Sequence, residues 1–278
     1  MPTRIIDAHC HIYPEDIASR AVRAVARFYN GLPETPSDGT AATLRRIGGA
    51  EGVCRFIVHS VATAPHQVSG INRFIARSVR ESKGAFIGMG TLHPDSEDLR
   101  ADFEEIRALG LAGVKLHPDI QGFFADDPRA CEIYEMCQDA ALPVCLHASD
   151  RRFDYSNPPR LAGILRAFPR LKLIGAHLGG WSVWDEALRL LPDFPNFLVD
   201  TSSSFYMLPP DRARTLLRAY GSKRVMFGTD YPMWRPRPEI DRLLGLGLTD
   251  AEYEDIFWRT CAGLFDIRFD GQEEAPND

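Results

Sequence analysis

The sequence lacks an excess of basic residues: 32 Lys and Arg stand against 38 Asp and Glu, which gives a formal net charge of −6. Because nucleic-acid binding needs clustered cations to neutralise phosphates, this composition argues against a nucleic-acid partner. Long apolar runs are also absent, and none approaches the roughly 20 residues that cross a bilayer. The first apolar run begins too early to leave room for a signal peptide. We therefore expect no membrane partner and a cytoplasmic location.

The sequence also lacks the motifs of disulfide and serine-nucleophile chemistry. No CxxC pair occurs, and the cysteines lie mostly in apolar segments, so we expect reduced, structural thiols at Cys10, Cys54, Cys131, Cys137, Cys145 and Cys261. No GxSxG motif is present, and no histidine stands beside the run "DTSSS" at 200–204. We interpret that run as hydrogen bonding at the end of a strand.

The sequence does contain eight short β-type runs that alternate with helical patterns. With 278 residues, 45% of them hydrophobic, the chain can bury a large core. Runs that are apolar almost throughout are typical of parallel strands covered on both faces. The pattern predicts an α/β fold, a closed (β/α)8 TIM barrel, with a doubly wound open sheet as the main alternative. The runs are residues 4–9, 53–62, 85–92, 112–117, 142–149, 171–180, 196–204 and 224–232.

The same alternation of strands and helices also indicates the domain organisation. Residues 1–270 are predicted to form a single barrel domain, and the acidic residues 271–278 a disordered tail. Residues 14–52 are longer than a simple crossover, so we expect a lid or a contact between copies of the chain in a homo-oligomer. The pattern after Thr249 predicts an amphipathic helix on the outside of the barrel.

Polar residues recur at the ends of the predicted strands, where barrels of this kind build their active sites. In the stretch "RIIDAHCHIYP", His9 and His11 share one face of the first strand, because side chains alternate along a strand. Two imidazoles so placed suit a metal ion, although two polar residues on the solvated face of an edge strand give the same pattern. The residues at strand ends are His9, His11, Lys115, His147, His177 and Asp230.

Six strings span nearly the whole chain in this order: "DAHCH", "GVKLHP", "LPVCLHASD", "GAHLGG", "DTSSS" and "FGTDYP". Their order and spacing give the chain a resemblance to the amidohydrolase superfamily, and in particular to its amidohydrolase-related branch, which includes aminocarboxymuconate-semialdehyde decarboxylase. The resemblance implies a metal-dependent TIM barrel. The implied metal ligands are His9, His11, His147 and Asp230, and His177 matches either a ligand of a second metal or a general acid/base.

Lys115 occupies the position at which binuclear members of the superfamily use a carboxylated lysine as a bridge. With a bridge, Lys115 and His177 would complete a two-metal site. Without one, Lys115 would pair with a carboxylate such as Asp7 or contact an anionic substrate. Both possibilities stay open at the level of the sequence.

The chemistry expected of such a site is consistent with these roles. A divalent ion with an open position lowers the pKa of bound water to about 7. Asp230 would then take the proton of the attacking water, and His177 would carry protons in a lyase. The imidazole-rich ligand set favours Zn²⁺, while Mn²⁺ or Fe²⁺ would bind the same groups.

Loops after the strands are expected to set specificity. Arginines beside the presumed metal suit a small anionic substrate, because guanidinium pairs with carboxylate in a bidentate way. The candidate substrate-binding residues are Arg152, Tyr155, Trp181, Trp234 and His117.

Three functions agree with these features. The first is a metal-dependent hydrolase that acts on a small, carboxylate-bearing substrate through a metal-activated water. The second is a non-oxidative decarboxylase (carboxy-lyase) of a small aromatic or unsaturated acid. The third is a metal-binding protein without turnover, which ranks last because the set contains both ligands and candidate proton carriers.

Overall fold

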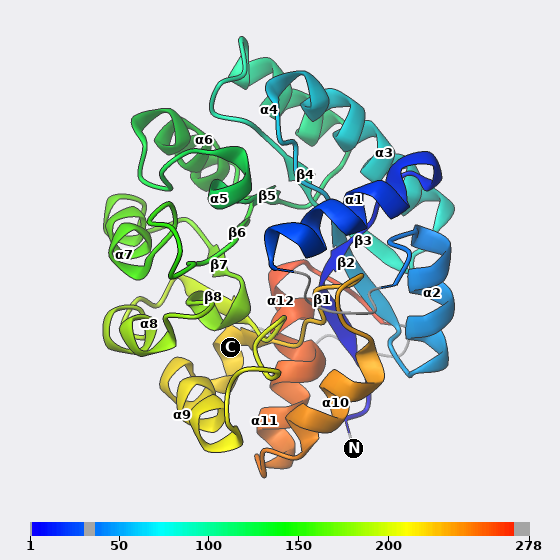
Figure 1. The fold of residues 1–278 in the computed structure, drawn as a ribbon, viewed down its shortest axis with the longest axis vertical. Coiled ribbons are helices and arrows are strands. Elements are labelled where there is room, and N and C mark those ends of the chain that lie inside the picture. Colours follow the sequence, from blue (N-terminus) through cyan, green and yellow to red (C-terminus); the bar gives the residue numbers. More distant parts are fainter. Residues whose placement is uncertain (1, 31–36, 270–278) are drawn as a thin grey trace.

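The computed structural model describes residues 2–30 and 37–269. The acidic tail predicted at 271–278 lies outside the described residues. In the part of the chain that is described, parallel strands form a central barrel with helices around it (Figure 1). The TIM-barrel prediction is therefore confirmed, and the doubly wound alternative is wrong.

Each of the eight predicted runs contains a strand. The third run is broken at Met89, whose backbone N–H bonds to Val58, whereas Gly90 bonds to Gly113. The last strand meets the first through backbone bonds, including Ala8 N–H to the Phe227 carbonyl at 2.8 Å, and these bonds close the barrel. The strands are β1 Ile6–His11, β2 Arg55–His59, β3 Phe86–Gly88, β4 Gly90–Thr91, β5 Val114–Leu116, β6 Val144–Leu146, β7 Leu173–Gly175, β8 Phe197–Asp200 and β9 Val225–Met226.

The helices begin at clear sequence signals. Proline opens five of them, where its missing N–H and fixed φ suit the first turn. Thr249 forms a capping box with Glu252 at the start of α11. The helices are α1 Glu15–Phe28, α2 Ala41–Ala50, α3 Val68–Glu81, α4 Leu99–Ala108, α5 Pro118–Gln121, α6 Pro128–Asp139, α7 Pro158–Ala167, α8 Trp184–Leu190, α9 Pro210–Tyr220, α10 Pro236–Leu244, α11 Asp250–Glu254 and α12 Thr260–Leu264. None of the described helices is long and apolar enough to cross a bilayer.

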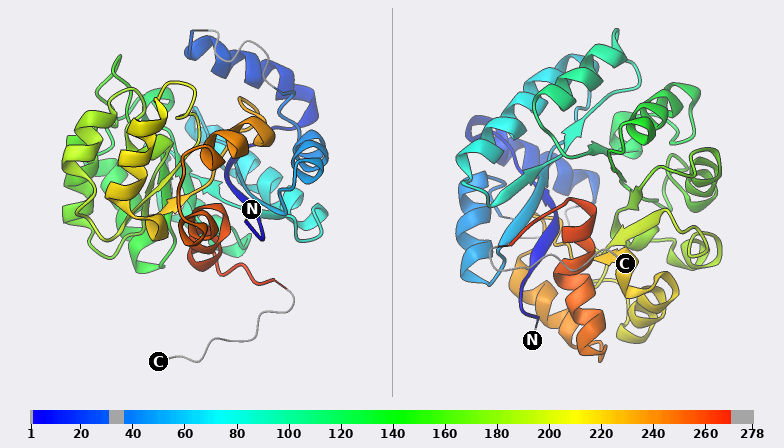
Figure 2. Two further views of the ribbon diagram at one scale, coloured as in Figure 1. Left: turned by 90° about the horizontal axis from the view of Figure 1, so that it is seen from below. Right: turned by 180° about the vertical axis from the view of Figure 1, so that it is seen from behind.

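The C-terminal helix corrects one expectation from the sequence. The helical turns from Asp250 to Leu264 do not lie only on the outer surface of the barrel. Trp258 and Cys261 pack with inward-facing strand residues such as Ile6 and Met226, so this segment covers the N-terminal end of the barrel. The view from behind shows α12 lying across that end (Figure 2). Periodicity found the apolar stripe but could not tell which surface it covers.

Helix α1 lies across the opposite end, the mouth of the barrel (Figures 1 and 2). The segment predicted as a lid or an oligomer contact therefore includes a helix placed over the strand ends. Ala18 and Val22 of α1 are buried, whereas Ile17, Ala21 and Val25 are only half-buried. The helix thus has a second apolar stripe that does not pack into the core.

Candidate metal centre and active site

The structure brings the predicted residues together at the mouth of the barrel. His9 and His11 lie on β1, and Lys115 lies on β5. His147 follows β6 directly, whereas His177 and Asp230 follow β7 and β9 within a few residues. Because the C-terminal ends of parallel strands meet at one end of a barrel, these side chains converge although they are far apart in sequence.

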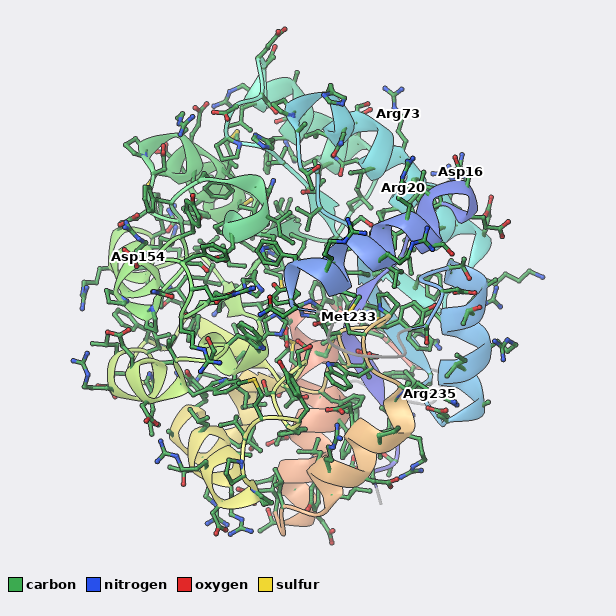
Figure 3. The ribbon with its side chains drawn as sticks, viewed as in Figure 1. Asp16, Arg20, Arg73, Asp154, Met233 and Arg235 are labelled. Carbon is green, nitrogen blue, oxygen red and sulfur yellow. The ribbon has the colours of Figure 1, made fainter. Side chains whose placement is uncertain are left out.

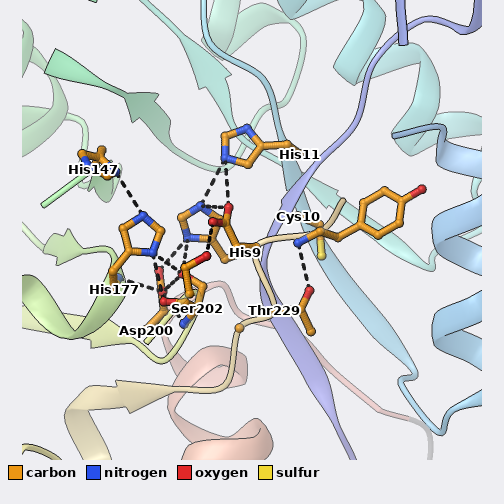
Figure 4. Close-up of polar contacts among 12 residues, drawn as sticks. His9, Cys10, His11, His147, His177, Asp200, Ser202 and Thr229 are labelled. Atoms are coloured by element: carbon orange, nitrogen blue, oxygen red, sulfur yellow. Dashed lines mark hydrogen bonds and ion pairs between the residues drawn. The ribbon is translucent and has the colours of Figure 1, made fainter. Parts of the chain in front are cut away.

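Three atoms of the predicted metal ligands form a compact triangle, which we call the ligand triangle. Figure 4 labels two of these residues, His9 and His11. His9 Nε2 lies 3.3 Å from His11 Nε2, and Asp230 Oδ1 lies 3.5 Å and 3.6 Å from these two nitrogens. Four ligands at about 2.1 Å around a tetrahedral ion stand about 3.4 Å apart. The triangle therefore has the dimensions of one face of a metal-binding tetrahedron.

The orientation of His9 also suits a cation. Its Nδ1 lies 2.8 Å from Asp200 Oδ2, and a carboxylate can only accept, so Nδ1 carries the proton and Nε2 presents its lone pair. Burial lowers the pKa of His9 and that of His11 well below 6.5, so both rings are neutral. If His11 carries its proton on Nε2, the 3.3 Å contact with His9 is a hydrogen bond. If His11 carries that proton on Nδ1, both Nε2 atoms and Asp230 Oδ1 present lone pairs to one point, and these lone pairs repel unless positive charge lies between them. The donor set thus fits a divalent ion.

His177 and His147 form a second, linked pair. His177 Nδ1 donates to the Ser202 carbonyl at 3.0 Å, so its Nε2 accepts from His147 Nδ1 at 3.1 Å. Burial lowers the pKa of His177 to about 4, although Asp200 opposes that shift. His177 also has a φ of 59°, a left-handed conformation that is uncommon outside glycine and recurs at functional sites. The two rings are thus fixed relative to each other, and the role of His147 as a metal ligand stays a prediction.

Asp230 is held by hydrogen bonds on the side away from the triangle. Ser203 Oγ donates to Asp230 Oδ2 at 2.5 Å, and Trp234 Nε1 donates to Ser203 Oγ at 2.8 Å. Burial raises the pKa of Asp230 to about 7. A bound cation acts in the opposite direction, because it favours the carboxylate. Asp230 also has a positive φ of 63°.

Lys115 is buried among these groups. Its Nζ lies 3.4 Å from His9 Nε2 and 3.5 Å from Cys145 Sγ. Asp7, suggested above as its partner, instead accepts hydrogen bonds from the Thr229 N–H at 2.9 Å and the Thr229 hydroxyl at 2.5 Å. The pairing of Lys115 with Asp7 is therefore wrong, because the first strand turns Asp7 toward the loop after β9. The bridge role of Lys115 stays a prediction.

His117 lines the cavity beside these groups, but its nitrogens are already used. Nδ1 accepts from the Ile120 N–H at 3.3 Å, and Nε2 lies 2.9 Å from the Tyr29 hydroxyl. Its ring stacks on His147 with centroids 3.9 Å apart. His147 Nε2 is buried without a hydrogen-bond partner among the described residues, 3.7 Å from Asp119 Oδ2. The ligand atoms of His117, Asp119 and His147 lie close enough together for a cation. However, both His117 nitrogens already have partners, and lone pairs in two parallel ring planes do not converge on one point.

Three residues of the site are not among those predicted from the sequence. Asp200 ends β8 and therefore stands at a strand end like the predicted residues, but the run of serines after it suggests only hydrogen bonding. Tyr29 comes from the long segment after β1, and no sequence signal marked it. The sequence does not single out His59 within β2, yet its ring lies edge-on to those of His9 and His11 with centroids 4.7 and 4.4 Å away.

A cavity of about 740 Å³ opens from this cluster, lined among others by His11, Lys115, His147, His177 and Asp230. A much smaller side pocket includes Trp181 and Trp234 in its wall. Of the other predicted substrate-binding residues, His117 lines the large cavity, whereas Arg152 and Tyr155 line neither space. The Arg152 guanidinium instead binds Asp150, at 2.6 Å, and the Phe28 carbonyl, at 2.7 Å. Arg152 therefore holds α1 rather than facing the cavity.

Two curated proteins illustrate what this chain is similar to. The 2-amino-3-carboxymuconate-6-semialdehyde decarboxylase of Dictyostelium discoideum is 24% identical over 200 residues, which are 58% of this chain and 55% of that protein. The gamma-resorcylate decarboxylase of a Polaromonas species is 23% identical over 254 residues, 70% of this chain and 75% of that protein. The match thus spans about half the length of the first relative and three quarters of the second.

Solved structures show the same fold. A TIM-barrel protein of Bordetella bronchiseptica superposes with a TM-score of 0.80 at 21% identity, over 95% of this chain and 98% of that one. The dihydroxybenzoic acid decarboxylase of a Polaromonas species, with bound manganese and the inhibitor 2-nitroresorcinol, gives 0.71 at 17% identity, over 96% and 97%. The sequence pattern of the Amidohydro_2 (amidohydrolase) family matches residues 6–267, nearly the whole chain. The chain therefore belongs to the Amidohydro_2 family of amidohydrolases.

Proposed function

We propose that this chain is a metal-dependent decarboxylase of a small aromatic or unsaturated carboxylic acid. The observation that carries the proposal is the ligand triangle at the inner end of a large cavity, with Lys115 and His177 lining the same end. Both curated relatives are decarboxylases, which favours decarboxylation over the hydrolysis ranked first from the sequence.

The residues present can hold a divalent ion and a carboxylate together. His9, His11 and Asp230 would bind the ion, with His147 as the further ligand expected from the sequence. When bound, such an ion supplies positive charge that holds substrate oxygens and stabilises negative charge during the reaction. Zinc is expected from the imidazole-rich set, whereas manganese is the ion in the Polaromonas structure, so the metal proposed here is a divalent cation of either kind.

The polypeptide itself must supply a proton. Decarboxylation replaces a carbon–carboxylate bond by a carbon–hydrogen bond, so one proton reaches the carbon that carried the carboxyl group. His177 and Asp230 line the cavity and are the candidates. Because His177 Nδ1 donates to the Ser202 carbonyl, Nε2 is the ring nitrogen that can take up and release a proton, and it lies next to His147 Nδ1. Lys115 Nζ, buried beside His9, is placed to attract the substrate carboxylate.

The test is a comparison of two products. Protein loaded with Mn²⁺ or Zn²⁺ is offered hydroxybenzoic and unsaturated dicarboxylic acids, and carbon dioxide release is measured. The same protein is offered lactones and amides, and acid release is measured. We expect carbon dioxide from at least one acid, and a rate roughly two to four orders of magnitude lower with His177→Ala. Hydrolysis of a lactone or amide without any carbon dioxide would overturn the proposal, and metal binding without either reaction would favour a protein without turnover.

A further inference from the structure

The cavity extends well beyond the residues that the proposed reaction needs. It continues beneath α1, whose residues from Ile17 to Phe28 contribute to its wall. With a rise of 1.5 Å per residue, that part of the helix is about 16 Å long. The cavity volume of about 740 Å³ falls in the range of pockets that enclose drug-sized ligands. A single aromatic ring with its carboxyl group would fill only the inner end.

The wall of this outer part is mostly apolar, although Arg20, Thr63 and Gln67 also line the cavity. Helix α1 contributes Ile17 and the residues four, seven, eight and eleven positions after it, which lie on one face of the helix. Helix α3 supplies the opposite wall. We call this part the apolar arm; it is lined by Ile17, Ala21, Ala24, Val25, Ile71 and Phe74. Ile17, Ala21, Val25, Ile71 and Phe74 are half-buried, so their exposed area faces the cavity rather than the core. An apolar face of this kind favours an apolar occupant.

The direction of the arm follows from the two ends of α1. At the C-terminal end, Tyr29 bonds to His117 at 2.9 Å and its ring lies 6.1 Å from that of His147. At the other end, Asp16 lies toward the periphery of the molecule, with Arg20 further in along the helix, whereas Met233 lies near the barrel axis (Figure 3). The arm therefore runs outward from the ligand triangle, between α1 and α3. Arg20 lines the cavity near its outer end.

We propose that the substrate carries an extended alkyl substituent, which occupies the apolar arm while its carboxyl group lies at the ligand triangle. The substrate class is thus an alkyl-substituted aromatic acid rather than a bare ring acid. The choice of an acid as the head group rests on the proposed decarboxylase function. The arm itself rests on the lining residues and on their continuity with the cluster of histidines.

Binding measurements test the arm without requiring turnover. Isothermal titration calorimetry is carried out on the metal-loaded protein with 2-hydroxybenzoic acids that bear alkyl chains of zero to eight carbons, in each ring position. Each methylene that enters an apolar site contributes about 0.8 kcal/mol, so we expect the Kd to fall about fourfold per carbon until the arm is full. A Kd independent of chain length in every positional series would overturn the inference.

A single substitution can shorten the arm. Gly70 of α3 lines the cavity, and a Cβ built there meets no other atom within 4 Å. Gly70→Phe therefore adds a side chain without a clash at its first carbon, and it replaces a residue that weakens helices. We expect it to weaken binding of the octyl acid at least tenfold more than binding of the unsubstituted acid.

The matched control is Gly163→Phe in α7. A Cβ there also meets no other atom within 4 Å, but Gly163 does not line the cavity. We expect it to leave the Kd of both acids unchanged, and thermal unfolding of both variants checks that they fold. Equal losses with the two variants would contradict the arm.

Two failures can be told apart. If affinity rises with chain length but no acid releases carbon dioxide, the arm stands and the decarboxylase proposal fails. If the unsubstituted acid is decarboxylated and longer chains bind no better, the decarboxylase proposal stands and the arm fails.

Discussion

At the scale of single residues, acceptors that cannot donate decide which nitrogen of a histidine faces the cavity. Asp200 fixes the proton of His9 on Nδ1, and the Ser202 carbonyl fixes that of His177 on Nδ1. Asp200 also accepts from the backbone N–H of His177 at 3.2 Å. One buried carboxylate therefore helps to orient both histidines, although it faces neither the triangle nor the cavity.

The first prediction concerns Asp200. In Asp200→Asn the amide oxygen can still accept from His9, but the negative charge that strengthens this bond is lost. We expect the affinity for Mn²⁺ or Zn²⁺ to fall roughly 10- to 100-fold, the usual effect of losing such a partner. Competition with a chelating dye measures it, with Asp193→Asn, at an exposed position before β8, as the control. Unchanged affinity would remove Asp200 from the site.

The second prediction separates metal binding from proton transfer. His177→Ala should keep one metal ion per chain but lose roughly two to four orders of magnitude in turnover, as expected of a general acid/base. Asp230→Ala should lose both, because Asp230 Oδ1 is one corner of the triangle. Elemental analysis and carbon dioxide release are measured side by side. Normal turnover by His177→Ala would return His177 to a structural role.

How far the sequence predicts single residues depends on where their partners lie. His9, His11, Lys115, His147, His177 and Asp230 could be named because each stands at a strand end, and strand ends meet in a barrel. Tyr29 could not, because its contact with His117 depends on the path of a long connection. Arg152 was named for the wrong partner: an arginine in a loop suits an anionic ligand, but here Asp150 and a helix carbonyl take its donors.

At the scale of elements, helix α1 is held over the mouth at its C-terminal end. The Arg152 guanidinium lies 5.0 Å from the Phe28 ring centroid and 5.8 Å from that of Trp181, in addition to its bond to the Phe28 carbonyl. These contacts connect α1 to the loops after β6 and β7. The wall of the apolar arm therefore depends on contacts outside the arm.

The third prediction tests this attachment. Arg152→Ala removes the hydrogen bond to the Phe28 carbonyl and the contact with the ring, so the end of α1 should open more often. We expect amide hydrogen exchange to speed up several-fold in peptides that cover Val25–Tyr29, with no change in α4. Arg151→Ala, at an exposed neighbouring residue, is the control. Equal exchange in both variants would show that other contacts hold the helix.

The helices that alternate regularly with strands are predicted well from the sequence. The role of α1 and the place of the helix after Thr249, which lie outside that alternation, are predicted less well. Helical patterns in the sequence predict helices at 69–83, 96–109, 127–141, 157–168 and 211–220. The structure has α3, α4, α6, α7 and α9 at these places, with ends that differ by at most three residues. The amphipathic pattern of α1 does not show that the helix lines a cavity. In the sequence, an apolar stripe that faces a cavity has the same spacing as one that packs in the core. The same ambiguity misplaced the helix after Thr249.

At the scale of the whole molecule, several buried acids make stability depend on pH. Burial raises the pKa of Glu239 to about 7, and its contact with Arg242 lowers it only in part. Glu239 lies on α10, outside the candidate metal centre. An acid with a raised folded-state pKa binds more protons in the folded than in the unfolded protein, so its contribution to stability is lost as pH rises from about 4.5 to about 7.

The fourth prediction follows from that sign. Glu239→Gln keeps the size of the side chain but cannot ionise, so it should remove this part of the pH dependence. Relative to the wild type, the variant should gain stability between pH 4.5 and pH 8, by about 3 kcal/mol at most. Urea unfolding across this range measures it, with Glu135→Gln at an exposed position of α6 as the control. A constant difference at all pH values would contradict the assignment.

The last prediction links the candidate metal centre to the stability of the whole barrel. The ligand triangle joins His9 and His11 of the first strand with Asp230, which follows the last strand, so a cation bound there connects the two ends of the barrel wall. A ligand that binds only the folded state at 100 times its Kd adds about 2.7 kcal/mol, which for a chain of this size raises Tm by roughly 5–10 °C. We expect this rise when Mn²⁺ or Zn²⁺ is added to chelator-treated protein. The double variant His9→Ala/His11→Ala should show none, whereas His66→Ala, outside the cavity, should respond like the wild type. An equal rise in the double variant would place the stabilising metal elsewhere in the molecule.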